Sequence, residues 1–367
     1  MTRVRTLTRR EFMRLAGTVA GLAGVTILLP GCQPAAQPTP TPALSPGMVD
    51  TSRYKKNPPW VVGRAGSGDV NAWMVMFSAH FEYGIKEKYK DKFKEYYVTA
   101  ANFDAAKQIS DAEDLLARNL DLLFLDPISE AALVGVVEKA MDAGVPVILA
   151  STRVRTDKYV SWVTTDNVRI GYLGADWLGK RLGGKGNVVL TMGAPGSSYA
   201  EDWLRGARQA LSKYPDIKEV GLAYCFWSPV EAKKAMEAFI QANPQIDGVI
   251  PGGGQMALGA VDAFLDAGKP IPPMGGADDW NGWLAKAKEH KVEFFAVSGG
   301  SSMSLTCVDL AVDVLSGKPV PKYVEYPVVT FDHTELDKYY RPDLNDQYWA
   351  VHELPEEWVQ RLYGKKG

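Results

Sequence analysis

The sequence predicts an α/β protein with two doubly wound, parallel-sheet lobes and a ligand cleft between them. Short apolar runs recur from Pro59 onward, and each ends in a loop with Gly or Pro before a stretch of helical period. Such uninterrupted runs are typical of strands covered on both faces, and the helices between them predict parallel βαβ units. About ten runs are too many for one compact half, which predicts two lobes. Examples are residues 60–62, 122–125, 145–149, 188–190, 248–250 and 294–297.

Two aspartates mark the starts of predicted helices. Asp104 precedes residues 105–108, and Asp166 precedes residues 167–170. The side chain of Asp readily accepts a hydrogen bond from the free N–H groups of a first helical turn. Both aspartates are therefore predicted to be helix caps.

The N-terminal residues 1–31 have the pattern of an export signal. Five arginines lie within residues 2–14, and the apolar stretch that follows is shorter than the roughly 20 residues of a membrane-spanning helix. Residues 8–13 (Thr-Arg-Arg-Glu-Phe-Met) resemble the twin-arginine export motif, and residues 29–32 (Leu-Pro-Gly-Cys) resemble a bacterial lipobox. The second resemblance implies cleavage before Cys32 and a lipid on its sulfur. The alternative is an ordinary signal peptide with an incidental cysteine.

Residues 32–57 are expected to form a tether between the lipidated cysteine and a globular body. Proline recurs at positions 34, 38, 40, 42 and 46 among Thr, Ala and Gln, a composition typical of an extended spacer. Five arginines and one glutamate precede Cys32, so cleavage would change the formal net charge from −2 to −6. A mildly acidic body argues against nucleic acid as a partner.

The loops that follow the strands hold the candidate binding residues, because ligands of open α/β sheets bind beyond the carboxyl ends of the strands. These loops are rich in amides, carboxylates, hydroxyls and tryptophans, as in residues 66–73, 151–153, 226–227 and 277–280. Flat aromatic rings stack on the C–H faces of a sugar, and polar groups bond to its hydroxyls. A carbohydrate site is one interpretation. The alternative is that strand-end loops are simply rich in Gly, Ser and Asp.

The sequence lacks the motifs of common catalytic and metal sites. It has no phosphate-binding Gly-Lys-Ser/Thr loop, no Gly-x-Ser-x-Gly elbow and no Cys-x-x-Cys, and its four histidines show no i, i+4 pairing. Asp69 or Asp278 could act as an acid or base, but recognition of a hydroxyl is the plainer role. The sequence thus predicts neither an enzyme nor a bound cofactor or metal. Cys225 and Cys307 could pair, but two separate buried thiols are expected.

Three motifs of the globular body, roughly residues 58–335, are typical of one family. They are Asp166-Asn167 followed by Gly171 and Gly174, Val-Pro-Val-Ile at 145–148, and Gln-Met-Ala-Leu-Gly-Ala at 255–260. With these motifs the body resembles the type I periplasmic binding proteins of the ribose and galactose group. The resemblance implies two lobes joined by a three-segment hinge, with crossings near residues 163–165, 298–299 and 326–328. The expected lobes are residues 58–164 with 299–327, and residues 165–298 with 328–367, whose last part forms a C-terminal strap.

The resemblance also implies site residues, carried over position by position. Ser67, Asn71 and Trp73 match a Ser, an Asn and an aromatic residue of the family's first loop. Trp227 matches an aromatic residue that stacks on the sugar, and Asp278 matches an aspartate after the ninth strand. The predicted ligand-binding residues are Ser67, Asp69, Asn71, Trp73, Ser151, Thr152, Arg153, Trp203, Trp227, Gly253, Asp278 and Ser298.

Several of these positions depart from the family's pattern. Ser151 and Thr152, with Arg153 next, stand where the family has an Asp-Arg pair that grips the sugar. Trp203 and Gly253 replace an Arg and an Asn. Fewer charged groups and more tryptophan imply a less hydroxylated sugar, a deoxy sugar or a polyol.

The implied function is that of a monomeric, extracytoplasmic and lipid-anchored substrate-binding component of an ABC importer. It would close on a monosaccharide or related polyol by hinge motion and then dock on a membrane permease. Two other classes stay open. One is a nucleoside- or signal-binding lipoprotein on the same fold, and the other is an extracytoplasmic carbohydrate-active enzyme.

Overall fold

The computed structural model describes residues 45–365. The predicted export signal, Cys32 and residues 33–44 of the predicted tether lie outside these residues. Met48 and Val49 pair with residues 320–321, and Tyr54 is buried in the first lobe, so residues 48–57 belong to the globular body and not to a tether as expected. Within the described part of the chain, no helix is both long enough and apolar enough to span a bilayer.

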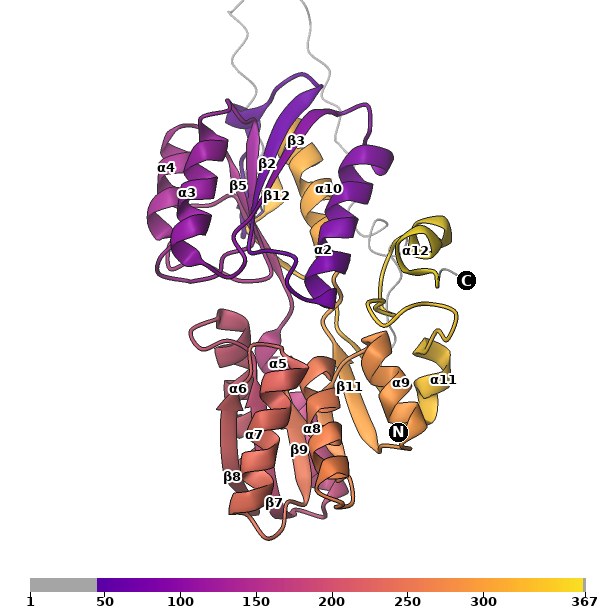
Figure 1. The fold of residues 1–367 in the computed structure, drawn as a ribbon. Coiled ribbons are helices and arrows are strands. Elements are labelled where there is room, and N and C mark those ends of the chain that lie inside the picture. Colours follow the sequence, from indigo (N-terminus) through magenta and orange to yellow (C-terminus); the bar gives the residue numbers. More distant parts are fainter. Residues whose placement is uncertain (1–44, 366–367) are drawn as a thin grey trace, which may run out of the picture. The chain divides into compact units, whose positions relative to one another are not determined.

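The first lobe is built on a six-stranded sheet in the order β13-β6-β5-β4-β2-β3, in which all neighbouring strands are parallel. Helices α3 and α4 lie on one side of the lobe, and α2 and α10 lie on the other (Figure 1). Along β4, Leu122 and Phe124 pack towards α2 and α10, whereas Leu123 and Leu125 pack towards α3 and α4. Both faces are thus covered, as the continuous apolar sequence predicted. The elements are β2 (Trp60–Gly66), α2 (Ala72–Tyr83), η2 (Gly84–Lys88), β3 (Phe93–Ala100), α3 (Ala105–Leu116), β4 (Leu122–Leu125), α4 (Val134–Asp142), β5 (Val147–Ala150), β6 (Ser161–Thr164), α10 (Met303–Leu315) and β13 (Tyr323–Glu325).

The second lobe repeats this design on a sheet in the order β14-β11-β10-β9-β7-β8. Helices α5 and α6 cover one face, and α7, α8 and α9 supply apolar side chains to the other. The elements are α5 (Asn167–Arg181), β7 (Lys185–Met192), α6 (Ser198–Leu211), β8 (Asp216–Tyr224), α7 (Pro229–Ala242), β9 (Gly248–Pro251), α8 (Gly254–Asp266), β10 (Met274–Ala277), α9 (Asn281–Glu289), β11 (Phe294–Ser298) and β14 (Val329–Asp332).

The chain passes between the two sheets after Thr164, after Ser298 and after Glu325. These points lie within or next to the crossings expected from the sequence. After the third crossing, β14 enters the second sheet from the end at which β11 leaves it, and it therefore runs antiparallel to β11. The fold class is confirmed, with β14 as the one antiparallel strand of the two large sheets.

Short elements complete the described chain. Strand β1 pairs with β12 in a small antiparallel ribbon, and the C-terminal residues after β14 lie beside α9 (Figure 1). The remaining bounds are β1 (Met48–Val49), η1 (Ser52–Tyr54), β12 (Val320–Pro321), η3 (His333–Glu335), α11 (Leu336–Tyr339) and α12 (Glu356–Tyr363).

Local sequence explains where helices α3 and α5 begin and why α5 and α6 pack closely. The carboxylates of Asp104 and Asp166 accept the N–H groups of Lys107 and Arg169, which confirms both predicted caps. Helices α5 and α6 approach so closely that a Cβ on Gly206 would lie 1.8 Å from the carbonyl oxygen of Val168. No side chain fits there, so glycine sets the distance between these helices.

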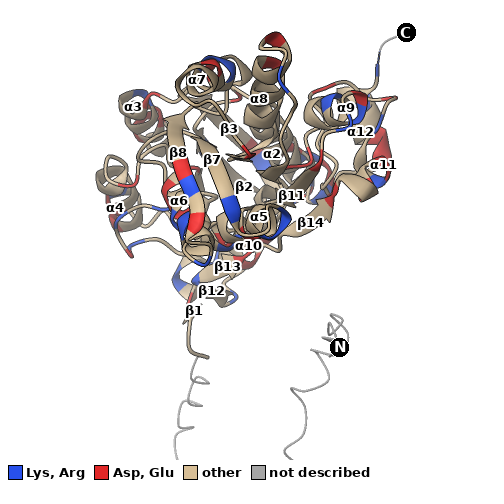
Figure 2. Ribbon diagram, turned by 90° about the horizontal axis from the view of Figure 1, so that it is seen from below, with Lys and Arg blue, Asp and Glu red and all other residues tan. Residues whose placement is uncertain are grey.

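The two cysteines of the described residues are free and buried in different lobes. The expectation of separate thiols at Cys225 and Cys307 is confirmed. Charged residues of both signs are interspersed on the outer helices, including α3, α4 and α7 (Figure 2). This mixture matches the near-balanced charge of the sequence.

Candidate functional site

A cavity of about 330 Å³ lies at the carboxyl ends of the strands and is lined by residues of both lobes. Its volume falls at the small end of the range of ligand pockets. Seven of the twelve predicted binding residues line it: Ser67, Asn71, Trp73, Ser151, Thr152, Trp227 and Asp278.

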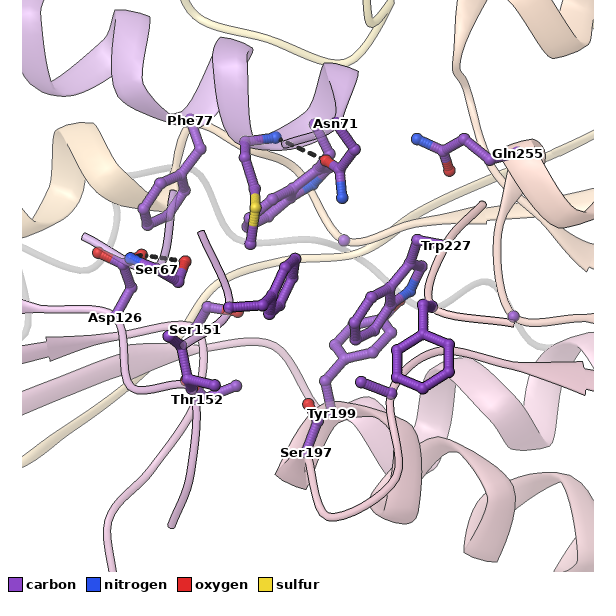
Figure 3. Close-up of a pocket in the computed structure, with 18 of the residues that line it drawn as sticks. Ser67, Asn71, Phe77, Asp126, Ser151, Thr152, Ser197, Tyr199, Trp227 and Gln255 are labelled. Atoms are coloured by element: carbon purple, nitrogen blue, oxygen red, sulfur yellow. Dashed lines mark hydrogen bonds between the residues drawn. The ribbon is translucent and has the colours of Figure 1, made fainter. Parts of the chain in front are cut away.

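On the first-lobe side, a buried ion pair fixes a hydroxyl at the cavity wall. The Oδ2 atom of Asp126 accepts hydrogen bonds from the amide and the hydroxyl of Ser67, at 2.8 and 2.5 Å (Figure 3). Arg64, only 2% exposed, donates its Nε to Asp126 Oδ1 at 3.0 Å. Burial by itself would lower the pKa of Arg64, but the Asp126 carboxylate outweighs it and raises that pKa. The contact with Arg64 thus positions the carboxyl group that orients Ser67.

Asn71 and Trp73 enter the cavity from the start of α2. The Oδ1 atom of Asn71 accepts the N–H of Met74 at 3.0 Å and caps the helix, which leaves the amide NH₂ as the donor available to a ligand (Figure 3). Trp73 stacks on Phe77 with ring centroids 4.9 Å apart. The helix start therefore offers one polar group beside an aromatic surface.

Ser151 and Thr152 follow β5 on the same lobe. Ser151 has a φ of 64°, a left-handed conformation that side chains other than Gly seldom adopt and that is often found at functional sites. Its carbonyl accepts the hydroxyl of Thr164 at 2.6 Å, and Thr152 Oγ1 donates to the carbonyl of Pro127 at 2.5 Å. These bonds hold the strained turn in place.

Across the cavity, Phe226 and Trp227 both have left-handed backbone conformations, with φ of 53°. In the opposite lobe, Asn102 and Phe103 form another left-handed pair, with φ of 52° and 63°. The rings of Phe103 and Trp227 are nearly parallel, 16° apart in plane and 6.1 Å between centroids. The two strained turns thus present aromatic faces to each other across the cleft.

Asp278 is the acidic group of the second lobe at the cavity. Its carboxylate accepts the N–H of Gly254 at 2.7 Å and the N–H of Trp280 at 3.1 Å. Burial and the adjacent Asp279 raise the pKa of Asp278 to about 7. Gly253, with φ of 151°, does not line the cavity, and its conformation delivers the N–H of Gly254 to Asp278.

Four other predicted residues also lie outside the cavity wall, and packing explains each. Asp69 accepts the Ser78 hydroxyl at 2.5 Å and borders a separate cavity of about 50 Å³ in the first lobe. Trp203 is 1% exposed in the core of the second lobe, and Ser298 is 1% exposed between two lining residues. Arg153 turns away from the cavity.

Arg153 instead joins the two lobes. Its Nη1 lies 2.6 Å from Asp202 of α6, and its Nη2 lies 3.0 Å from Glu130 of the first lobe. Its amide also donates to the hydroxyl of Ser198 at 3.4 Å. The guanidinium therefore contacts acidic partners of both lobes and does not line the cavity.

Several residues that line the cavity are not among those predicted from the sequence. Phe77 lies on α2 four residues past Trp73, where helical spacing could have placed it, whereas Met74 is the residue next to Trp73 and is not on the same helix face by that spacing. Gln255, which follows the glycines after β9, is not among the predicted binding residues, although its side chain points into the cavity (Figure 3). Trp349 comes from the distant C-terminal segment, for which the sequence carries no signal. The others that line it are Phe103, Asp126, Pro127, Ile128, Ala194, Pro195, Ser197, Tyr199, Phe226, Gly252, Val297, Gly299 and Met303.

The chemistry of the wall suits a neutral ligand. Among the residues the structure describes, no Lys, Arg or His lines the cavity, and no cluster of three potential metal ligands occurs. A phosphate or carboxylate would lose its hydration without a cation to compensate it. Hydroxyl, amide and carboxyl groups alternate with aromatic rings, which is an arrangement for a compound with both hydroxyls and C–H faces.

Comparison with known proteins places the chain in a family. Residues 68–319 match a family model described as a periplasmic binding protein domain. The chain is 30% identical over 241 residues to the xylitol-binding protein of Mycolicibacterium smegmatis, which covers 65% of this chain and 69% of that protein. It is 27% identical over 252 residues to the ribose import binding protein of Bacillus subtilis, with 69% and 82% covered.

A solved structure, an ABC transporter solute binding protein from Thermobispora bispora, superposes with a TM-score of 0.74 at 26% identity. The match covers 83% of this chain and 94% of that one. The extent of the family match and these similarities agree with the two-lobed fold and its cavity. The chain therefore belongs to the periplasmic binding protein family, whose members are binding proteins rather than enzymes.

Proposed function

We propose that this protein is the solute-binding component of an ABC-type importer and that its solute is a neutral monosaccharide or a related polyol. The observation that carries the proposal is the cavity wall, which combines aromatic faces with neutral hydrogen-bonding groups and, within the described residues, contains no cationic side chain. Sugars and polyols have the matching surface, with C–H faces for the rings and hydroxyls for the polar groups. The names of the xylitol- and ribose-binding relatives support the same ligand class.

Binding would proceed by closure of the lobes about the three crossings. The polar groups come from both sides, with Ser67 and Asn71 on the first lobe and Asp278 on the second. A ligand that bonds to both lobes favours the state in which they are close together. Arg153 and the pair formed by Phe103 and Trp227 act between the lobes and add to that state without needing a ligand contact.

We assign ligand contacts to the seven predicted residues that line the cavity, and we add Asp126 and Gln255. Asp126 is held by Arg64, and Asp278 has a raised pKa, so the site has little free negative charge for a cationic solute. The many aromatic rings favour a solute with an extended C–H face. A deoxy sugar or a polyol is therefore the expected form.

The cellular setting follows from the sequence and belongs to the same proposal. Residues 1–31 direct export, Cys32 carries a lipid and residues 33–47 tether the body to the membrane surface. The first lobe comprises residues 58–164 with 299–327, and the second comprises 165–298 with 328–367. The protein acts as a monomer that docks in its closed form on a membrane permease.

A thermal-shift screen of the purified protein tests the ligand class. The panel contains neutral pentoses, hexoses, deoxy sugars, polyols and nucleosides. A ligand present at 100 times its dissociation constant stabilises the folded state by about 2.7 kcal/mol, so a specific solute produces a clear rise in melting temperature. A shift with a sugar or polyol is expected. A shift with nucleosides alone would move the assignment to a nucleoside-binding protein, and no shift at all would contradict it.

Two matched tryptophan variants sharpen the screen. Trp227 stacks on Phe103 in the cavity, whereas Trp177 of α5 stacks on Phe295 elsewhere, with centroids 5.8 Å apart. Trp227→Ala should abolish most of the ligand-induced shift. Trp177→Ala should retain it, even if the variant starts from a lower melting temperature.

A further inference from the structure

The C-terminal strap, defined as residues 340–365, supplies part of the cavity wall. Trp349, 4% exposed, lines the cavity together with residues that lie more than 45 positions earlier in the chain. The family model match ends at residue 319, so this wall lies outside the matched region. The strap is therefore a candidate for a feature that distinguishes this protein's solute.

The backbone around Trp349 is fixed to the second lobe directly beside the predicted ligand residue Asp278. Trp349 forms a β-bridge with Trp280. The N–H of Ala350 donates to the Asp279 carbonyl at 3.2 Å, and the N–H of Val351 donates to Asp279 Oδ2 at 2.5 Å. The backbone of Trp349 thus has a defined position relative to the segment that carries Asp278.

The rest of the strap is anchored by burial and by one buried amide. Asn281, 1% exposed, donates its Nδ2 to the carbonyls of Arg341, Leu344 and Asn345, and its Oδ1 accepts the N–H of Arg341. Besides Trp349, six hydrophobic side chains of the strap are buried, and removal of their apolar surface from water stabilises its packing on the lobe. They are Leu344, Tyr348, Leu354, Trp358, Val359 and Tyr363. The strap is a packed layer of the lobe.

The strap also reaches the first lobe at α2. The Nδ1–H of His80 donates to the carbonyl of Met76 at 2.8 Å, so its Nε2 is the acceptor and takes the N–H of Glu353 at 3.1 Å. Burial lowers the pKa of His80 to about 3, which keeps the ring neutral and this assignment constant. The ring of Trp358 meets Tyr83 edge-on at 5.5 Å. The strap thereby abuts the helix whose first turn carries Asn71 and Trp73.

We propose that the strap is a third wall of the solute cavity and that Trp349 is a specificity-determining residue. This inference rests on the proposed function and deepens it. The face of an indole accepts a C–H surface but offers no partner to a hydroxyl, which would be left without a hydrogen bond on burial. The edge of Trp349 carries its Nε1–H, which is buried without a partner among the described residues and can donate to one solute oxygen. Solutes that place a C–H face or a missing hydroxyl against the ring face of Trp349 are preferred over those that place a hydroxyl against that face.

The test is isothermal titration calorimetry of the full mature protein with matched pairs of neutral sugars and their deoxy forms. Trp349→Ala should weaken binding of the preferred solute by about tenfold. It should also lower the ratio of the affinity for that solute to the affinity for its more hydroxylated partner. Trp349→Phe, which keeps an aromatic face, should retain most of that ratio. Trp358→Phe, at a buried strap position outside the cavity wall, should retain both the ratio and the affinity.

The outcomes separate the inference from the function on which it rests. Unchanged affinity ratios in a folded Trp349→Ala protein, alongside a wild-type protein that binds sugars, would overturn the specificity role alone. Absence of binding by the wild-type protein to every sugar and polyol would overturn both the inference and the proposed function. A changed ratio in Trp349→Ala but not in Trp358→Phe supports the inference.

Discussion

Replacement of Arg153 by Gln should weaken solute binding even though its side chain does not line the cavity. Its Nη1 lies 2.6 Å from Asp202 in the other lobe, and these partners are about 34% and 9% exposed. A hydrogen bond to a charged group contributes about 1.5–3 kcal/mol when buried, and the partial exposure of Arg153 reduces this to about 1 kcal/mol. Because the bond joins the lobes, its loss disfavours the closed state.

A loss of about 1 kcal/mol corresponds to about a fivefold weaker affinity. The assay is calorimetry with the solute identified by the thermal-shift screen, at low and high salt. The fivefold effect should shrink at high salt, since ions screen a partly exposed pair.

Arg155→Gln is the matched control. Arg155 contacts the same Glu130 that Arg153 contacts, but only within the first lobe and with its side chain 70% exposed. Its replacement should leave the affinity unchanged. A double-mutant cycle of Arg153→Gln with Asp202→Asn should show coupling of the two effects. Equal affinities for the Arg153 and Arg155 variants would refute the assignment of Arg153 to lobe closure.

Three further predictions follow from other parts of the structure. Ligand affinity should fall by up to about tenfold per pH unit below pH 7, because a ligand hydroxyl favours ionised Asp278, whose pKa is about 7, and Asp278→Asn should remove this dependence in calorimetry. Gly206→Ala should lower the stability by about 1–3 kcal/mol in urea unfolding, whereas Gly135→Ala, in a helix with free space, should preserve or raise it. Cys225 and Cys307 should react with a thiol reagent only after unfolding, because both are buried. Thiol labelling of the folded protein, unchanged stability of Gly206→Ala in urea, or solute affinity that does not vary with pH would each contradict the corresponding argument.

Much of the fold was predictable because its signals are local. Continuous apolar runs such as residues 122–125 became central strands, and Asp104 and Asp166 became caps, as neighbouring residues alone indicate. The direction of β14 was not predictable in this way. It depends on where the chain re-enters the second sheet after the crossing that follows Glu325.

The candidate site was predictable where a residue's position in a strand-end loop decides its exposure to the cleft. Ser67 and Trp227 are such residues, and both line the cavity. Arg153 lies in the same kind of loop, but its side chain forms an ion pair with Asp202 of the other lobe and does not line the cavity. Neither this ion pair nor the contribution of Trp349 from the C-terminal strap can be predicted from the local sequence.

The most direct test of the central claim compares one neutral sugar or polyol with its phosphate ester by calorimetry. A cavity wall without cationic side chains among the described residues predicts that the neutral compound binds one-to-one and is recovered unchanged, while the ester binds far more weakly. Tighter binding of the phosphate ester, or conversion of the bound sugar to a product, would contradict the account.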